Sequence, residues 1–184
     1  MIFNPYIHHR RSIRLRGYDY AKSGKYFITL CSYERARLFG EVINGCMILS
    51  ELGRIVTEEW LRTPVIRSNV ELGEFILMPD HFHGIILILE ERNGEHVGAN
   101  SYSPRQSSQF APTVTPFRSP SNTIGAIIRG FKGSTTKRVN EMRGTPGVHL
   151  WQRNYYDHII RNEYELDQIR KYMRLNPSRW ASGG

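Results

Sequence analysis

A short alternation of histidine and an aromatic residue, followed by an aliphatic run, constrains the fold of this chain more than any other feature. His81, Phe82 and His83 directly precede the apolar stretch 85–89. Because side chains alternate across a strand, the two histidines are predicted to share one strand face, about 6.6 Å apart along the chain. Two imidazoles so placed can hold one metal ion. The simpler alternative is that they are hydrogen-bonded polar residues at a strand start.

The rest of the chain alternates strand-like and helix-like patterns. Strands are predicted where β-branched and aromatic residues cluster, and helices where apolar residues recur at helical spacing after a capping residue. The predicted elements are, in order, strand 25–33, its hairpin partner 37–48, a helix after Ser50, strand 70–77, strand 81–89, a helix after Thr123, strand 148–160 and helix 163–175. This order predicts an α+β fold with helices packed against a mostly antiparallel sheet.

Turn, cap and breaker residues mark the ends of these elements. The hairpin is predicted to turn near Asn44-Gly45, and the strand that carries the histidines follows a turn at Pro79-Asp80. Ser50 and Thr123 are typical helix N-caps. Pro177 is predicted to stop the last helix, because the residue before a proline disfavours the helical conformation.

One domain, residues 1–184, is expected, since a chain of 184 residues can bury a single core. Two segments stand apart within it. Residues 1–17 form a basic N-terminal arm, and residues 91–122 are rich in Asn, Gly, Ser, Pro and Gln. The composition of 91–122 predicts a flexible insertion loop.

The charge of the chain favours an anionic partner, most simply nucleic acid. Twenty-five Lys and Arg residues against seventeen Asp and Glu residues give a net charge of +8. The basic residues expected to contact DNA are Arg10, Arg11, Arg14 and Arg16 in the arm, and Arg129, Lys132, Lys137 and Arg138 on the helix after Thr123.

Cysteine content and hydropathy predict the compartment. The two cysteines, Cys31 and Cys46, form no Cys-x-x-Cys pair, which argues against a disulfide framework or a zinc cluster. The longest aliphatic run, 85–89, is far shorter than the roughly 20 residues that span a bilayer. We therefore expect a soluble cytoplasmic protein, associated with the nucleoid and not with a membrane.

A second set of candidate residues lies in the last predicted helix. Tyr172 and Asn176 are four residues apart, so their side chains share a helix face. If they face a metal held by the histidine pair, Asn176 would add an oxygen ligand, and Tyr172 could attack a phosphodiester to form a covalent protein–DNA ester. A helical tyrosine is more often a packing residue, and Tyr155 and Tyr156 are competing candidates.

Three ordered motifs carry a family resemblance: 78–86 (MPDHFHGII), 151–161 (WQRNYYDHIIR) and 172–177 (YMRLNP). Together they resemble the single-tyrosine transposases of the HUH endonuclease class, above all the REP-associated tyrosine transposases, over roughly residues 18–177. The resemblance implies a ferredoxin-like (RRM-like) core with the histidines on a central strand and a divalent ion, Mg²⁺ or Mn²⁺. It also implies cleavage of single-stranded or hairpin DNA that leaves a 5′-phosphotyrosine.

Residue by residue, the resemblance assigns the metal ligands to His81, His83 and Asn176 and the nucleophile to Tyr172. Asp80 stands where relatives often carry Asn, and insertion-sequence relatives commonly carry Gln in place of the helical Asn176. Insertion-sequence relatives are dimers, whereas the REP-associated branch can act as monomers. We expect a monomer, with a homodimer as the alternative.

Two rival functions belong to other classes. A metal-dependent hydrolase without a covalent step would need a different motif, because Ile85 occupies the position of a third alternating histidine. A non-catalytic DNA-binding protein derived from a transposase would have no physical need for the combination of two histidines, a tyrosine and an amide. A covalent protein–DNA band in a denaturing gel would separate the predicted enzyme from both rivals.

Overall fold

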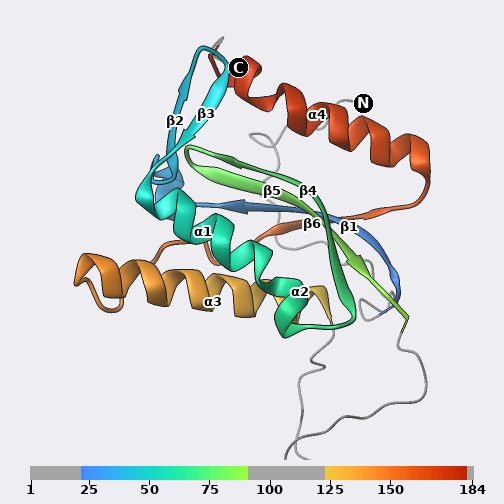
Figure 1. Ribbon diagram of the computed structural model, residues 1–184, viewed down its shortest axis with the longest axis horizontal. Helices are drawn as coiled ribbons and strands as arrows, with labels where there is room; N and C mark the ends of the chain where they lie inside the picture. Colours follow the sequence, from blue (N-terminus) through green and yellow to red (C-terminus); the bar gives the residue numbers. More distant parts are fainter. Residues whose placement is uncertain (1–21, 91–122, 182–184) are drawn as a thin grey trace, which may run out of the picture.

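The computed structural model describes residues 22–90 and 123–181, which build a four-stranded sheet with helices on both faces (Figure 1). Its elements are β1 (Gly24–Cys31), a 3-10 turn η1 (Tyr33–Arg35), β2 (Gly40–Ile43), β3 (Cys46–Leu49), α1 (Glu51–Leu61), α2 (Thr63–Ile66), β4 (Val70–Met78), β5 (His81–Ile88), α3 (Ile124–Arg143), β6 (Tyr156–Ile160) and α4 (Glu163–Ala181). The predicted arm 1–17 and the predicted loop 91–122 lie outside the described residues. No helix in the described ranges has the length and hydropathy needed to cross a membrane.

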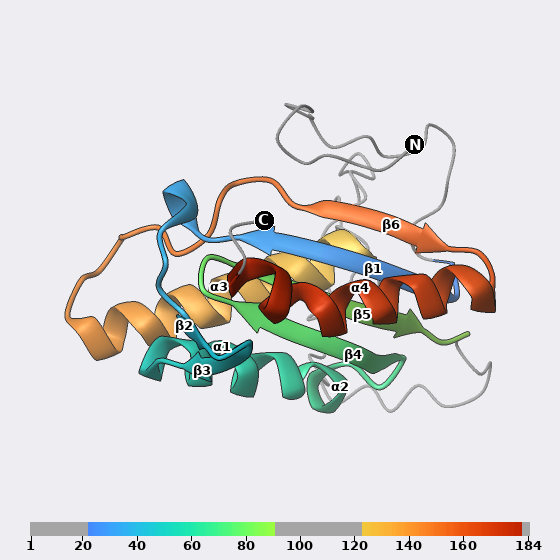
Figure 2. The ribbon, with the colours of Figure 1, turned by 90° about the horizontal axis from the view of Figure 1, so that it is seen from above.

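The sheet has the strand order β4-β5-β1-β6, and all neighbouring strands are antiparallel. Helices α1 and α3 cover one face, and α4 lies across the other (Figures 1 and 2). Without η1, the β2–β3 hairpin, α2 and the last helix α4, the chain follows the β-α-β-β-α-β order of ferredoxin-like folds. The α+β, ferredoxin-like prediction is therefore confirmed.

Large aromatic side chains fill the space between the sheet and helices α1 and α3. The ring of Trp60 from α1 lies 4.6 Å from that of Phe82 on β5 and 5.2 Å from that of Phe131 on α3, between centroids. Gly84 follows on the same face of β5, and a Cβ added there would lie 2.6 Å from Trp60 Cζ2. Glycine at this position lets the indole pack directly on the strand backbone.

A smaller apolar cluster holds α4 on the opposite face. Phe27 of β1, Ile85 of β5 and Ile160 of β6 are buried against Leu166 and Met173 of α4. Since residues two apart on a strand share a face, the side of β5 that carries Ile85 also carries both histidines. The catalytic candidates therefore lie beneath α4 and not in the main core.

The predicted caps and turns are found where expected. The Ser50 hydroxyl accepts a hydrogen bond from the Gly53 amide at 3.1 Å at the start of α1, and the Thr123 hydroxyl accepts one from the Ala126 amide at 3.2 Å at the start of α3. These bonds satisfy amides that have no partner within the helix.

The prediction that 37–48 pairs with the first strand is wrong. β2 and β3 pair only with each other, while β1 pairs with β5 and β6. The turn itself is as predicted, because Asn44 and Gly45 both have positive φ, 51° and 74°, as a tight two-residue hairpin requires. Short alternating strands specify a hairpin locally but carry no information about a third strand.

The predicted strand 148–160 is too long, since β6 begins at Tyr156. Leu150 and Trp151 are consecutive and both buried in the main core, which a regular strand does not allow because it turns alternate residues to opposite faces. Trp151 instead donates its indole N–H to the Thr135 hydroxyl of α3 at 2.8 Å. The aromatic residues of 148–155 reflect packing under α3.

The prediction that Pro177 stops the last helix is also wrong, because α4 continues to Ala181. A proline removes one helical hydrogen bond, but tertiary contacts can hold the following turn in place. Pro177 is buried, Ser178 lies beside the tip of the β2–β3 hairpin at Gly45, and the ring of Trp180 lies 5.8 Å from that of His81. The contacts of the last turn with the sheet side of the molecule override the local signal.

Candidate active site

His81 and His83 lie side by side on the α4 face of the sheet. β5 is an inner strand, and its register with β1 pairs His81 with Cys31 and His83 with Thr29. The two imidazole centroids are 4.7 Å apart, and both residues are buried. The predicted arrangement of two histidines on one strand face is therefore present.

His83 connects the sheet to the last helix. Its Nδ1 is hydrogen-bonded to the Thr29 hydroxyl at 2.8 Å, and its Nε2 is hydrogen-bonded to the Tyr172 hydroxyl at 3.2 Å. The imidazole also stacks on Phe27, with ring centroids 5.3 Å apart. Two residues 89 positions apart in the chain thus meet, which places the hydroxyl of Tyr172 at the edge of the histidine pair.

The surroundings of His83 favour its neutral form. Burial lowers the pKa of His83 well below its ordinary value of 6.5, and electrostatic interactions with His81 and Arg35 lower it further, because each disfavours a positive charge on His83. A neutral imidazole keeps a nitrogen lone pair, which a cation or a hydroxyl proton requires. At neutral pH, His83 can therefore act as a ligand or as a hydrogen-bond acceptor.

His81 has a charged partner where His83 has a hydroxyl. An oxygen of the Asp80 carboxylate, Oδ1, lies 2.5 Å from His81 Nδ1, and the other, Oδ2, lies 3.1 Å from Arg35 Nε. Because an ionised carboxylate can only accept hydrogen bonds, His81 must donate from Nδ1, and in the neutral form of the ring Nε2 is then the acceptor nitrogen.

Asn176 lies one helical turn beyond Tyr172, as the spacing predicts. The residue is 9% exposed, and its buried amide nitrogen has no hydrogen-bond partner within the part of the chain that the structure describes. A buried amide without a partner is costly, and such groups are uncommon in folded proteins. The side chain can present its amide oxygen to a cation on the histidine side of α4.

The three candidate ligands fit a divalent ion that accepts mixed nitrogen and oxygen donors. Two imidazoles suit Mn²⁺ better than Mg²⁺, and the amide oxygen suits either ion. Residues 22–90 and 123–181 contain no group of three or more His, Cys, Asp and Glu side chains that could hold a metal. A metal site here would therefore depend on the amide of Asn176 and on water or substrate oxygens to complete its coordination.

The competing tyrosines differ in placement. Tyr155 packs against the main core, whereas Tyr156 lies on the α4 face, with its ring 6.5 Å from that of Phe27. The hydroxyl of Tyr172 is hydrogen-bonded to His83, and Tyr172 is 39% exposed, so a substrate can reach it. The geometry therefore favours Tyr172 over Tyr155 and Tyr156.

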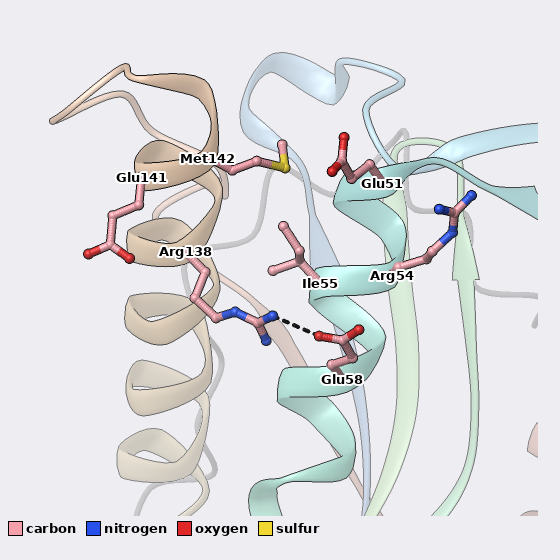
Figure 3. A pocket seen from close by; sticks show the side chains of 7 residues that line it. All are labelled: Glu51, Arg54, Ile55, Glu58, Arg138, Glu141 and Met142. Atoms are coloured by element: carbon pink, nitrogen blue, oxygen red, sulfur yellow. Dashed lines mark hydrogen bonds and ion pairs between the residues drawn. The ribbon is translucent and has the colours of Figure 1, made fainter.

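The basic residues of α3 lie across the sheet from this site. Arg138 forms ion pairs with Glu58 at 2.7 Å and Glu59 at 2.8 Å, and the first of these crosses the shallow pocket between α1 and α3 (Figure 3). Lys132 donates to the backbone carbonyls of Gln152 and Arg153, and Lys137 lies 3.7 Å from Glu141. The structure does not bring these residues, or the exposed Arg129, to the histidines.

The structure places other cations near the site. Lys171 and Arg174 are exposed on α4, one and two residues from Tyr172, and Arg174 Nη2 lies 3.4 Å from Glu74 Oε1 on β4. The guanidinium of Arg37 lies 5.4 Å from the ring of Trp180. Their closeness to Tyr172 in the sequence could have identified the α4 residues, although positions one and two residues away do not share its helix face. Arg37 could not have been found this way, because its approach depends on the helix turn after Pro177. Arg10, Arg11, Arg14 and Arg16 lie outside the described residues.

Thr29 and Asp80 are the histidine partners that the sequence patterns did not reveal. Asp80 is predicted only as a turn residue, although its position directly before His81 is a usable signal. Thr29 has no such signal, because its place depends on the β1–β5 register.

Comparison with known proteins finds a solved structure with a similar fold and a relative with a similar sequence. No family model matches the chain. A solved REP-associated tyrosine transposase, bound to a REP hairpin, is similar in structure with a TM-score of 0.54 at 16% sequence identity, over 94% of this chain and 73% of that one. A protein of Haemophilus influenzae, named only as an uncharacterized protein, is 40% identical over 178 residues, 97% of this chain and 93% of its own. The chain thus shares the fold of a tyrosine transposase and belongs to the same family as the Haemophilus influenzae protein.

Proposed function

We propose that this protein is a metal-dependent single-stranded DNA endonuclease and strand transferase, with Tyr172 as the nucleophile. The observation that carries the proposal is the 3.2 Å hydrogen bond between the Tyr172 hydroxyl and His83 Nε2. Tyr172 and the two histidines lie together, and the buried amide nitrogen of Asn176, one helical turn beyond Tyr172, has no hydrogen-bond partner among the described residues. A packing role does not explain this concentration of polar groups. The fold shared with a REP-associated tyrosine transposase supports the same function.

The reaction would be a transfer of a phosphodiester to tyrosine. The Tyr172 oxygen forms a bond to phosphorus, the bond from phosphorus to the 3′ oxygen breaks, and the 5′ end of the downstream strand remains attached to the enzyme. The phenolic proton is lost to solvent, and the departing oxygen takes up a proton as a 3′ hydroxyl. Because the aryl phosphate is an ester as well, a 3′ hydroxyl of another strand can attack it and rejoin the DNA.

His81, His83 and Asn176 would hold the Mg²⁺ or Mn²⁺ ion. Such an ion supplies positive charge that stabilises the phosphate oxygens as charge develops on them. The Nε2 lone pair of His83 can serve either the Tyr172 hydroxyl or the ion, so with the ion bound the hydroxyl would be released from His83 and left beside the metal site, where it can attack the phosphate. The neighbour's REP hairpin makes hairpin-forming repeat DNA the first substrate to test, and we expect the enzyme to act as a monomer.

The test is a covalent adduct assay with single-stranded hairpin DNA and Mn²⁺. Tyr172→Phe removes only the hydroxyl, so it should keep fold and DNA binding while the adduct disappears from a denaturing gel. Tyr156→Phe is the matched control and should still form the adduct. A label placed 3′ of the cut should move with the protein.

Two outcomes would contradict the proposal. An adduct that persists in Tyr172→Phe but is absent in Tyr156→Phe would move the nucleophile to β6. A wild-type protein that binds the hairpin with Mn²⁺ present but forms no adduct would favour a non-catalytic DNA-binding protein derived from a transposase.

A further inference from the structure

The Asp80 carboxylate is a buried acid that bridges two other side chains of the site. Asp80 is 6% exposed, yet it lies at the end of a two-residue turn between β4 and β5, where carboxylates are usually solvated. One oxygen reaches His81 Nδ1 at 2.5 Å and the other reaches Arg35 Nε at 3.1 Å. The carboxylate therefore joins η1 to the first histidine.

The turn η1 is shaped to bring Arg35 to this position. Glu34 and Arg35 have φ values of 53° and 57°, in the left-handed region that non-glycine residues rarely adopt. The strained turn is held by surrounding bonds: the Ser32 amide and hydroxyl both donate to the Asp80 carbonyl at 2.9 Å, and Arg35 Nη1 donates to Cys31 Sγ at 2.9 Å. Strain that the fold maintains beside a polar site often serves that site.

The Asp80 carboxylate determines which ring nitrogen of His81 carries the proton. The carboxylate accepts a hydrogen bond from Nδ1–H, so in the neutral ring the other nitrogen, Nε2, keeps its lone pair. An isolated neutral histidine prefers the opposite tautomer, with the proton on Nε2, and that form cannot bind a cation through Nε2. A carboxylate on the far side of a histidine fixes both the tautomer and the ring orientation of metal-binding histidines.

We propose that Asp80 and Arg35 are positioning residues that hold His81 with its proton on Nδ1 and its Nε2 lone pair available to the cation. The inference rests on the proposed function and deepens it. Arg35 fixes the direction of the carboxylate, and Asp80 fixes the ring. Within the ranges that the structure describes, the partner of His83 Nδ1 is the uncharged hydroxyl of Thr29, so His81 is the better-defined ligand of the two.

The first measurement needs no metal. Long-range ¹H–¹⁵N correlation spectra report which nitrogen of a histidine carries the proton, and the spectrum of His81→Ala identifies the His81 signals. The wild type should show the Nδ1–H form of His81. Asp80→Ala should shift it toward the Nε2–H form, whereas Asp80→Asn should keep it, because the amide oxygen can still accept from Nδ1. A wild-type His81 with its proton on Nε2 would overturn the proposal.

The second measurement is the affinity for Mn²⁺ by calorimetry. Loss of a partner behind a metal-binding histidine typically weakens the metal about 10–100-fold, and we expect Asp80→Ala to fall in this range. Asp80→Asn and Arg35→Lys should weaken it less, since each keeps part of the chain of hydrogen bonds. Asp80→Ala with wild-type Mn²⁺ affinity would refute the role of Asp80.

A matched control separates positioning from a general loss of structure. Glu59→Ala removes another buried carboxylate, 4% exposed and paired with Arg62 and Arg138, on the opposite face of the sheet. It should leave the His81 tautomer and the Mn²⁺ affinity unchanged. If His81→Ala binds Mn²⁺ with wild-type affinity, the proposed metal site is wrong. If His81→Ala loses affinity but Asp80→Ala keeps the wild-type value, the metal site is supported and the positioning role of Asp80 is refuted.

Discussion

The two faces of the sheet differ in what they contain, although the same strands supply both. The face under α1 and α3 carries a continuous apolar core in which Trp60, Phe82 and Phe131 meet ring to ring. The face under α4 carries only a small apolar cluster, and beside it lie His81 and His83. Alternate residues of β5 contribute to each.

This difference shows that the residues that stabilise the fold and the polar residues of the candidate site lie on opposite faces of the same strand. The apolar face supplies most of the buried area that stabilises the fold. The polar face can then keep a buried pair of histidines and the Asn176 amide, whose nitrogen has no hydrogen-bond partner in the described part of the chain. Such buried polar groups would destabilise a small protein without a large apolar core. Substitutions on the two faces should therefore separate unfolding from activity.

The largest expected effect is a loss of stability on substitution of a residue in the core under α1 and α3. Trp60→Ala should lower the free energy of unfolding by about 3–5 kcal/mol, because it leaves a cavity among rings that cannot collapse. Trp180→Ala, on the α4 side and half buried, should lower it by less than about 1 kcal/mol. Urea denaturation of both variants checks this, and equal losses would show that the α4 face is as important for stability as the core.

The next effect should appear in α4. Met173→Ala removes a buried side chain of the small cluster and should cost about 2 kcal/mol, near the low end for such changes, since the cluster is small. Hydrogen exchange should accelerate in α4 before it does in α1, as expected if α4 opens locally. Leu175→Ala is the control, because Leu175 is 39% exposed on the same helix. A uniform rise in exchange would mean that the two faces unfold together.

A smaller effect is expected at Glu59, a buried acid on the core face. Burial alone would raise the pKa of Glu59, but hydrogen bonds from Arg138 and Ser134 and the charge of Arg62 outweigh it, so the pKa lies below its ordinary 4.5. A lowered pKa stabilises the fold above the unfolded-state value, and this contribution is lost as the pH falls through the folded-state value.

Glu59→Gln should therefore cost about 1–2 kcal/mol at pH 7. The cost should shrink as the pH falls below 4.5 and through the lower pKa of the folded state, where Glu59 of the wild type also becomes neutral. Unfolding curves at several pH values measure this difference, and adduct formation should not change. Glu141→Gln, at an exposed pair on α3, should show no such pH dependence. A constant penalty at every pH would assign the loss to packing and not to charge.

The smallest expected effect is on the salt dependence of DNA affinity. If the strand reaches Tyr172, Lys171→Ala with Arg174→Ala should reduce the slope of log affinity against log salt by roughly 0.7 for each phosphate that the variant no longer neutralises. Because α3 lies on the other face, Arg129→Ala with Lys137→Ala should change the slope less. The reverse result would place DNA on α3, as the sequence predicted, and the four N-terminal arginines can be tested in the same assay.

The sequence predicted features that depend on a few neighbouring residues. The alternation around Phe82 placed His81 and His83 on one face, the hydroxyls of Ser50 and Thr123 marked helix starts, and helical spacing related Tyr172 to Asn176. Each is a consequence of local geometry, which does not depend on the rest of the fold.

Features that depend on distant contacts were not predictable in this way. The tail of α4 continues past Pro177 because Trp180 contacts the sheet side of the molecule, and Leu150 and Trp151 leave the strand pattern because α3 covers them. Thr29 becomes a histidine partner only through the strand register. In each case a packing contact between remote segments outweighs the local preference.

The contact of Gly84 with Trp60 limits which substitutions this sequence can accept during evolution. A side chain at 84 would displace the indole or the strand that carries His83, and a smaller residue at 60 alone would leave a cavity. Each single replacement is unfavourable, while the pair together can be tolerated. An evolutionary path away from this pair must therefore cross an impaired intermediate, and in the family of this protein the two positions should change together or not at all.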